Sequence, residues 1–160
     1  MAYRVSGLSR ADFAGLFPLG DAALARRGAR RVIATTDRSF PCRISLEDAR
    51  AGESLILLHH VSHDVATPYR SAFAIFVREA ATEAAWFVDG TPPVFEGRPL
   101  AFRGFDADGN LASARLALPG EADGAIRALF DDPAIAYIHA HNAAHGCFAA
   151  RIDRHGEQDR

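Results

Sequence analysis

The chain has 160 residues, of which 49% are hydrophobic and 24% charged, and its formal net charge is -2 at pH 7. These values are typical of one globular domain with a substantial core, and they lack the basic excess of nucleic-acid-binding proteins. No apolar stretch approaches the roughly 20 residues of a membrane-spanning helix, and residues 1–8 lack a signal-peptide pattern. We therefore expect a cytoplasmic protein without a membrane or nucleic-acid partner, in which Cys42 and Cys147 are free thiols.

Short elements are predicted in the N-terminal part. Residues 3–8 favour a first strand, and Ser9 is a candidate N-cap for a short helix. A second helix is predicted over residues 22–27, because Gly28 stands where a helix commonly ends. Residues 31–35 contain several β-branched side chains and predict the next strand.

Two apolar strands are predicted in the middle of the chain. Residues 54–60 contain four consecutive apolar side chains, a pattern typical of a strand buried on both faces. A polar loop over residues 61–70 separates this strand from a second one over residues 72–78. Residues 86–88 predict a further short strand.

The next elements form a hairpin and a helix. Residues 100–105 and 111–118 flank the sequence Asp-Ala-Asp-Gly-Asn at 106–110, whose residue types accept the backbone conformations of a tight turn. Residues 121–130 predict an amphipathic helix.

Strands over residues 135–141 and 147–153 complete the predicted fold. Strands outnumber helices and do not alternate regularly with them. The sequence therefore predicts an α+β fold, a largely antiparallel sheet with two or three helices packed on it. We expect a single domain over residues 1–153, followed by a polar C-terminal tail at 154–160.

The segment 137–148 is the densest in functional groups. Side chains of a strand alternate between its two faces, so Tyr137, His139 and His141 share one face. If residues 142–146 form the loop of a hairpin, His141 lies opposite Cys147. The register then places His139 opposite Ala149 and Tyr137 opposite Arg151. The core face would hold Ile138, Ala140, Phe148, Ala150 and Ile152.

Three interpretations of this polar face remain open. In the first, His139 and His141 bind a metal ion, with His63 or Cys147 as a third ligand. In the second, a neighbouring histidine stabilises the thiolate of Cys147, which acts as a nucleophile or redox group. In the third, the histidines are hydrogen-bonded parts of the sheet and the cysteine only packs.

Arginines offer a weaker signal. Arg43 and Arg70 each follow a polar or aromatic turn, and a guanidinium can hold an anion through two parallel hydrogen bonds. A surface arginine is more often simply solvated. The chain contains neither a glycine-rich phosphate loop nor a nucleophile elbow.

Three blocks of sequence resemble the bacterial family called domain of unknown function 1203. They are residues 40–49 with 52–53, residues 67–70 with 74–78, and residues 137–143 with 146–148 and Arg154. The resemblance runs from about residue 24 to 154 and implies a single bacterial-type domain, but it supplies no function. It gives prominence to the positions Cys42, Arg43, His63, Tyr69, Arg70, His139, His141, Asn142 and Cys147.

Our leading hypothesis is a small-molecule-binding or enzymatic site lined by histidine, cysteine and arginine. Its candidate catalytic residues are Cys147, His141 and His139, and its candidate substrate-binding residues are Arg70, Asn142, His63, Cys42, Arg43 and Tyr69. The alternative is a non-catalytic binding or interaction module in which these residues are structural. The sequence assigns no cofactor, metal or oligomeric state.

Overall fold

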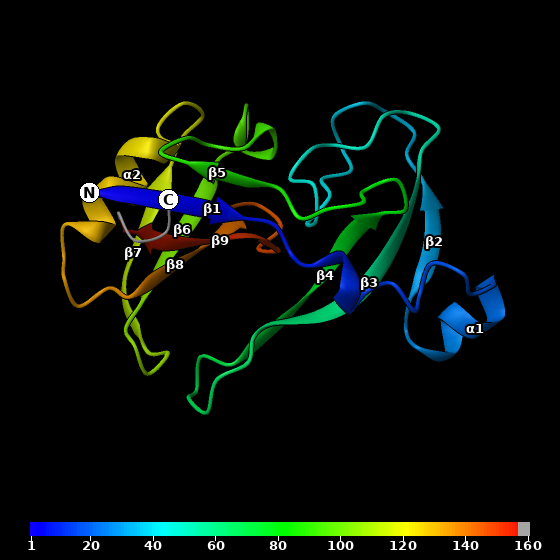
Figure 1. Ribbon diagram of the computed structural model, residues 1–160, viewed down its shortest axis with the longest axis horizontal. Coiled ribbons are helices and arrows are strands. Elements are labelled where there is room, and N and C mark those ends of the chain that lie inside the picture. Colours follow the sequence, from blue (N-terminus) through cyan, green and yellow to red (C-terminus); the bar gives the residue numbers. More distant parts are fainter. Residues whose placement is uncertain (157–160) are drawn as a thin grey trace.

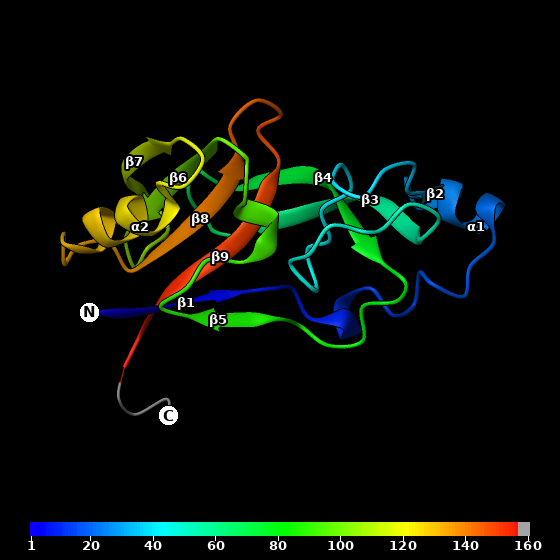
Figure 2. The same ribbon diagram turned by 90° about the horizontal axis from the view of Figure 1, so that it is seen from above.

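Two antiparallel sheets form the framework of the computed structural model, which describes residues 1–156 (Figures 1 and 2). The larger sheet holds six strands, in the order β5 (Trp86–Val88), β1 (Ala2–Ser6), β9 (Phe148–His155), β8 (Tyr137–Asn142), β6 (Leu100–Phe105) and β7 (Leu111–Ala117). The smaller sheet holds three, in the order β2 (Arg30–Ile33), β3 (Ser54–His63) and β4 (Ser71–Arg78). The described residues also form the helices α1 (Asp21–Arg26) and α2 (Ala122–Phe130), and 3-10 turns at Arg10–Asp12 and Pro93–Phe95.

The antiparallel, strand-rich character predicted from the sequence is confirmed, but two details differ. The strands form two sheets instead of one. Within residues 1–156 there are two α-helices, the lower limit of the expected number, and only α2 packs against the larger sheet. The six-residue α1 lies beside β2 and buries a single side chain, Leu24, so it covers little of any sheet.

Strand β3 connects the two sheets. Leu55 and Ile56 are both fully buried, on opposite faces, as a continuous apolar run predicts. The strand continues to His63, three residues beyond its predicted end. This extension carries His63 to the larger sheet, where its ring contacts Tyr137 of β8.

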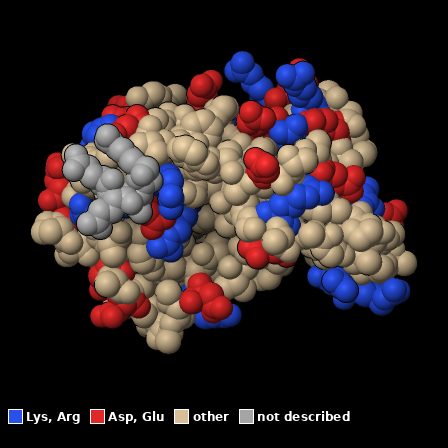
Figure 3. All heavy atoms as spheres, in the orientation of Figure 1, with Lys and Arg blue, Asp and Glu red and all other residues tan. Residues whose placement is uncertain are grey.

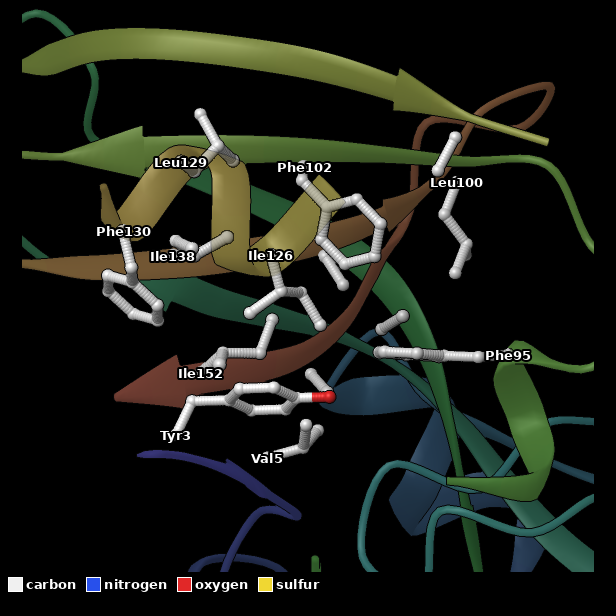
Figure 4. Packing of buried hydrophobic residues seen from close by; sticks show 14 of the residues in the cluster. Tyr3, Val5, Phe95, Leu100, Phe102, Ile126, Leu129, Phe130, Ile138 and Ile152 are labelled. Atoms are coloured by element: carbon white, nitrogen blue, oxygen red, sulfur yellow. The ribbon is translucent and has the colours of Figure 1, made fainter. Parts of the chain in front are cut away.

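The main hydrophobic core lies between the larger sheet and α2 (Figure 4). Ile138 of β8 faces this core together with Ile126 of α2 and Tyr3 of β1. Burial of this large apolar face is the principal force that holds α2 on the sheet. The odd-numbered side chains of β8 consequently point the other way, towards the smaller sheet.

A β-bulge changes the register that the sequence analysis predicted between the last two strands. Ala140 pairs with Ala150, but His141 pairs with Phe148, which leaves Ala149 as the extra residue. The predicted pairing of His141 with Cys147 is therefore wrong. The other two predicted pairings are wrong as well, since His139 pairs with Arg151 instead of Ala149, and Tyr137 pairs with Asp153 instead of Arg151.

The same bulge moves one side chain to the other face of the sheet. Ala150 and Ile152 lie in the main core as predicted. Phe148 is buried but lies on the opposite face, edge-on to the rings of His139 and His141. A local shift of one residue reverses the face of a strand side chain, and the sequence pattern did not reveal it.

The C-terminal strand is longer than predicted. β9 runs to His155, so Arg154 belongs to the sheet and not to a polar tail. Its guanidinium donates hydrogen bonds to the carbonyl oxygens of Phe130, Asp132 and Ile135, at 2.9, 2.9 and 3.1 Å. Arg154 therefore fastens the end of α2 to β9. The rest of the predicted tail, residues 157–160, lies outside the described residues.

Within residues 1–156, no helix is long and apolar enough to cross a membrane.

Candidate functional site

A cluster of four polar rings lies where the sheets meet, and we call it the histidine cluster: His63, Tyr137, His139 and His141. All four are buried, with at most 8% of any residue exposed. His63 reaches the cluster from the end of β3, and the other three side chains alternate along β8. The structure thus brings together His63, His139 and His141, as the sequence analysis expected.

Hydrogen bonds fix two of the three imidazoles. Nδ1 of His63 donates to the carbonyl oxygen of Tyr69 at 2.8 Å, and Nε2 forms a hydrogen bond with the Tyr137 hydroxyl at 2.7 Å. Nδ1 of His141 donates to the carbonyl oxygen of Gly146 at 2.9 Å. Nδ1 of His139 is buried and has no hydrogen-bond partner in the described part of the chain.

Burial keeps the central histidines neutral. Removal of the ring from water lowers the pKa of His139 from its ordinary 6.5 to about 2, and the nearby His63 and Arg151 act in the same direction. Burial likewise lowers the pKa of His141 to about 4, although its bond to the Gly146 carbonyl opposes the shift. Neutral rings packed against Phe105 and Phe148 are suited to brace the two sheets.

A shared metal ion is not favoured by this geometry. Both ring nitrogens of His63 are already hydrogen-bonded. Among residues 1–156, no group of three or more histidine, cysteine, aspartate or glutamate side chains is arranged to hold a metal ion.

Beside the histidine cluster lies a cavity of about 610 Å³, which we call the inter-sheet cavity. This volume is within the range of about 300–1,000 Å³ that is usual for small-molecule sites. No acidic side chain of residues 1–156 lines it. Its wall consists of Arg38, Ser39, Pro41, Arg43, Leu57, Ala74, Phe76, Arg98, Pro99, Asn142, Ala143, Ala144, His145 and Cys147.

Three arginines line the inter-sheet cavity, and their charges are balanced differently. Arg98 forms two hydrogen bonds with the carboxylate of Asp48, at 2.7 and 3.0 Å. Arg38 is exposed to solvent at the rim. Arg43 is only 3% exposed, and within residues 1–156 no carboxylate pairs with it. Arg43 is therefore the buried arginine of the cavity that has no ion pair of its own, although Asp48, which pairs with Arg98, also acts on it electrostatically.

Backbone carbonyls hold the Arg43 guanidinium in place. Nε donates to the carbonyl oxygen of Phe148 at 2.8 Å, and Nη1 donates to that of Pro41 at 2.6 Å. No described residue accepts a hydrogen bond from Nη2. Burial lowers the pKa of Arg43 to about 10, while the nearby sulfur of Cys147 acts in the opposite direction. The side chain remains a cation at neutral pH.

Cys147 and Asn142 enter the cavity from one tight turn. The Cys147 carbonyl accepts from the amide of Asn142 at 2.9 Å, and the amide of Gly146 donates to the Asn142 carbonyl at 2.7 Å. Gly146 has a φ of 77°, a conformation that glycine adopts without strain. The Cys147 thiol is partly exposed at the cavity wall, whereas His141 is buried outside it.

The remaining predicted site residues lie away from this cavity. Arg70 is exposed and pairs with Asp64 at 2.9 Å, and Tyr69 is 43% exposed. Cys42 is fully buried, and its sulfur accepts hydrogen bonds from the amides of Ile44, Ser45 and Arg78 at 3.3–3.4 Å. Tyr69 and Arg70 lie on the loop between β3 and β4, and Cys42 fixes a turn.

Replacement of Cys42 is expected to destabilise the fold. Cys42→Ala would leave buried amides without an acceptor and open a small void, so we expect a loss of about 1–3 kcal/mol in the free energy of unfolding. Urea unfolding measures it. Cys147→Ala is the matched control, because this partly exposed sulfur receives no backbone amide. Equal stabilities of the two variants would contradict the structural role of Cys42.

Sequence reasoning missed Arg38 and Arg98 at the cavity, and it gave no structural role to Arg154, which belongs to the third block of the family resemblance. All three arginines take part in contacts between segments that are distant in sequence. The one signal available was compositional, since all 18 basic residues are arginine and the chain has no lysine. That signal does not indicate which arginine enters a cavity.

The fold and the cavity define a class: an α+β protein of two antiparallel sheets with a positively charged cavity at their junction. The chain belongs to the family described as protein of unknown function DUF1203, whose model matches residues 39–154. The matched range contains every residue that lines the inter-sheet cavity except Arg38. Comparisons with curated proteins and with solved structures gave no match.

Proposed function

We propose that the inter-sheet cavity binds a small anionic molecule. The observation that carries this proposal is the buried Arg43, which lies in the cavity wall without a carboxylate partner. A buried charge is costly unless a partner of opposite sign compensates for it. An anion in the cavity would supply that charge, and its oxygen atoms would accept the hydrogen bonds that Nη2 does not make inside the protein.

The rest of the wall is consistent with a small ligand. Leu57 and Phe76 supply apolar surface, and the turn at Asn142 supplies polar groups. Small-molecule sites commonly combine apolar walls with a few fixed polar groups. We therefore assign ligand binding to Arg43, Asn142 and Cys147, while the histidine cluster next to them braces the sheets that form the cavity.

An interaction module is the second candidate function. Trp86 on the edge strand β5 is 67% exposed and lines a shallow cavity of about 520 Å³ together with Val88. Exposed aromatic side chains are enriched at protein interfaces. This surface lacks a buried charge without an ion pair, so the inter-sheet cavity remains the better supported site.

If an anion binds at Arg43, the anion should stabilise the folded protein beyond the general effect of salt. The midpoint of thermal unfolding should rise saturably with inorganic phosphate, compared with sodium chloride at equal ionic strength, because a ligand that binds only the folded state stabilises it. Acetate provides a second, smaller anion. An anion concentration about 100-fold above the Kd would raise the free energy of unfolding by about 2.7 kcal/mol.

Arg43→Gln separates binding from the general effect of salt, and Arg38→Gln is the matched control at the rim of the same cavity. The specific effect should disappear in the first variant and persist in the second. Identical midpoints of the wild type in phosphate, acetate and chloride would contradict the proposal.

Surface charge and free thiols also bear on the kind of partner and on the cellular location. Basic and acidic side chains are interspersed over the face shown in Figure 3, which argues for a small-molecule partner over a nucleic acid. Cys42 and Cys147 are both free thiols, which supports a location in a reducing cytoplasm, and we place the protein in bacteria through its family resemblance.

A further inference from the structure

Cys147 is the thiol that lines the inter-sheet cavity, where the imidazole of His145 and the hydroxyl of Ser39 also lie. The other cysteine, Cys42, is fully buried and bound by backbone amides. His139 and His141 are buried outside the cavity wall. A ligand in the cavity would therefore meet a thiol and not an imidazole of the histidine cluster.

The Arg43 guanidinium is anchored next to this thiol. Its Nε donates to the carbonyl oxygen of Phe148, the residue that directly follows Cys147. Arg43 and Cys147 line the same wall, which has no acidic side chain among its described residues. The carboxylate of Asp48 acts on Arg43 electrostatically, but it already pairs with Arg98. A neighbouring guanidinium stabilises a thiolate, which is the nucleophilic form of cysteine.

The turn that carries the thiol is held in one conformation. The Asn142 amide donates to the carbonyl of Cys147, the Gly146 amide donates to the carbonyl of Asn142, and His141 Nδ1 donates to the carbonyl of Gly146. A nucleophile held in a fixed geometry loses less entropy when it reacts. The histidine cluster therefore acts on Cys147 indirectly, by fixing the turn.

We propose that Cys147 is the nucleophile of a group-transfer site for small electrophiles that carry a carboxylate or phosphate. This inference rests on anion binding in the inter-sheet cavity. Arg43 holds the anionic group, and the thiol of Cys147 gives its proton to solvent. The resulting thiolate forms a sulfur–carbon bond to the electrophilic carbon, and the leaving group departs with the electron pair of the broken bond.

Alkylation with a matched pair of reagents tests the inference. Iodoacetate and iodoacetamide deliver similar groups, but only iodoacetate carries a carboxylate, and iodide is the leaving group of both. The ratio of the iodoacetate rate to the iodoacetamide rate at Cys147, located by peptide mass spectrometry, should be about tenfold higher in the folded than in the urea-unfolded protein. Cys42 should react with neither reagent while the protein is folded.

Variants and competition assign the effect. Arg43→Gln should abolish the preference for iodoacetate, whereas Arg38→Gln should keep it. Arg43→Gln also removes buried hydrogen bonds, so the wild type provides a measurement that does not depend on how this variant folds. In the wild type, inorganic phosphate should slow the reaction of Cys147 with iodoacetate more than its reaction with iodoacetamide. A preference that survives Arg43→Gln, or that Arg38→Gln removes equally, would overturn the role of Arg43.

The two proposals fail in different ways. If phosphate and acetate stabilise the protein but Cys147 reacts no faster than in the unfolded chain, anion binding stands and the nucleophile assignment is wrong. If Cys147 reacts rapidly with both reagents and shows no preference for iodoacetate, the thiol is reactive but the cavity does not select anions. That result overturns this inference, and the proposed function falls with it if phosphate and acetate also fail to raise the unfolding midpoint.

Discussion

The free energy of unfolding is expected to fall by about 4 kcal/mol when the pH is lowered from about 8 to about 5, because two buried histidines remain neutral in the folded protein. His139 and His141 have folded-state pKa values of about 2 and about 4, below the ordinary value of 6.5. In the unfolded chain both rings bind protons below about pH 6.5. Each ring therefore favours the unfolded state by about 2 kcal/mol at pH 5.

The sign and the pH window follow from these values. The contribution of each neutral histidine to stability is fully present above the unfolded-state pKa of about 6.5. It is lost progressively as the pH falls to the folded-state pKa, which is about 4 for His141 and about 2 for His139. The half-buried His60, whose pKa is also lowered by burial, adds to the loss in the same direction. Glu53, whose pKa is lowered by its bond to Arg78, contributes mainly at lower pH.

Charged and titratable neighbours of His139 lower its pKa, as burial does. His63 faces His139 from β3, while Arg151 of β9 and Arg103 of β6 also disfavour a proton on this ring. The neighbouring ring of Phe105 offers no hydrogen-bond acceptor. A proton on His139 would thus place a cation among other cations and apolar rings, and the unfolded state avoids this cost.

Urea unfolding at a series of pH values measures the effect, and single variants assign it. His139→Leu should remove about 2 kcal/mol of the difference between pH 8 and pH 5, because it eliminates one buried imidazole. His59→Gln is the control, since His59 lies exposed on β3. A pH dependence that is the same in both variants would show that buried histidines do not cause it.

Gly7→Ala is expected to lower the free energy of unfolding by about 3 kcal/mol, because the chain crosses another segment at this position without space for a methyl group. An added Cβ would overlap the carbonyl oxygen of Ile44 and lie 3.2 Å from that of Arg43. Neither carbonyl is free to move. The Ala85 amide donates to the Ile44 carbonyl at 2.9 Å, and the Leu8 amide donates to the Arg43 carbonyl at 2.7 Å.

Other glycines provide matched controls for this substitution. Gly15 has no neighbouring atom within 4 Å of an added Cβ, so Gly15→Ala should leave stability nearly unchanged. Gly124 lies in α2 with similar free space, and Gly124→Ala should raise stability by about 1 kcal/mol through helix propensity. Urea unfolding of the three variants checks the order. A Gly7→Ala variant as stable as Gly15→Ala would contradict the close crossing.

The sequence determined the local elements of this protein. The strands at residues 100–105 and 86–88 have the predicted bounds, and the turn at 106–110 joins β6 to β7 as predicted. The alternation along β8 correctly placed Ile138 in the core and His139 on the opposite face. These features depend on side chains that are close in sequence, so their periodicity is visible without the fold.

The sequence singled out residue types suited to a site, but it did not reveal their arrangement. Arg43, Asn142 and Cys147 meet in the inter-sheet cavity, whereas Arg70 and Cys42 do not contribute to it. Residue type indicates which chemistry a side chain can perform. It does not indicate whether that side chain is exposed, buried or paired, because burial depends on segments far away in the chain.

The tertiary structure alone decided how the strands divide into two sheets, where the bulge at Ala149 falls, and which arginine is buried without a partner. Strand alternation is the same in either sheet and in either register, so the local pattern cannot distinguish them. Long-range burial selects the arrangement. The extended β3 carries His63 to β8, and the bulge turns Phe148 towards the histidines. This packing leaves Cys147 beside Arg43 at the junction of the sheets.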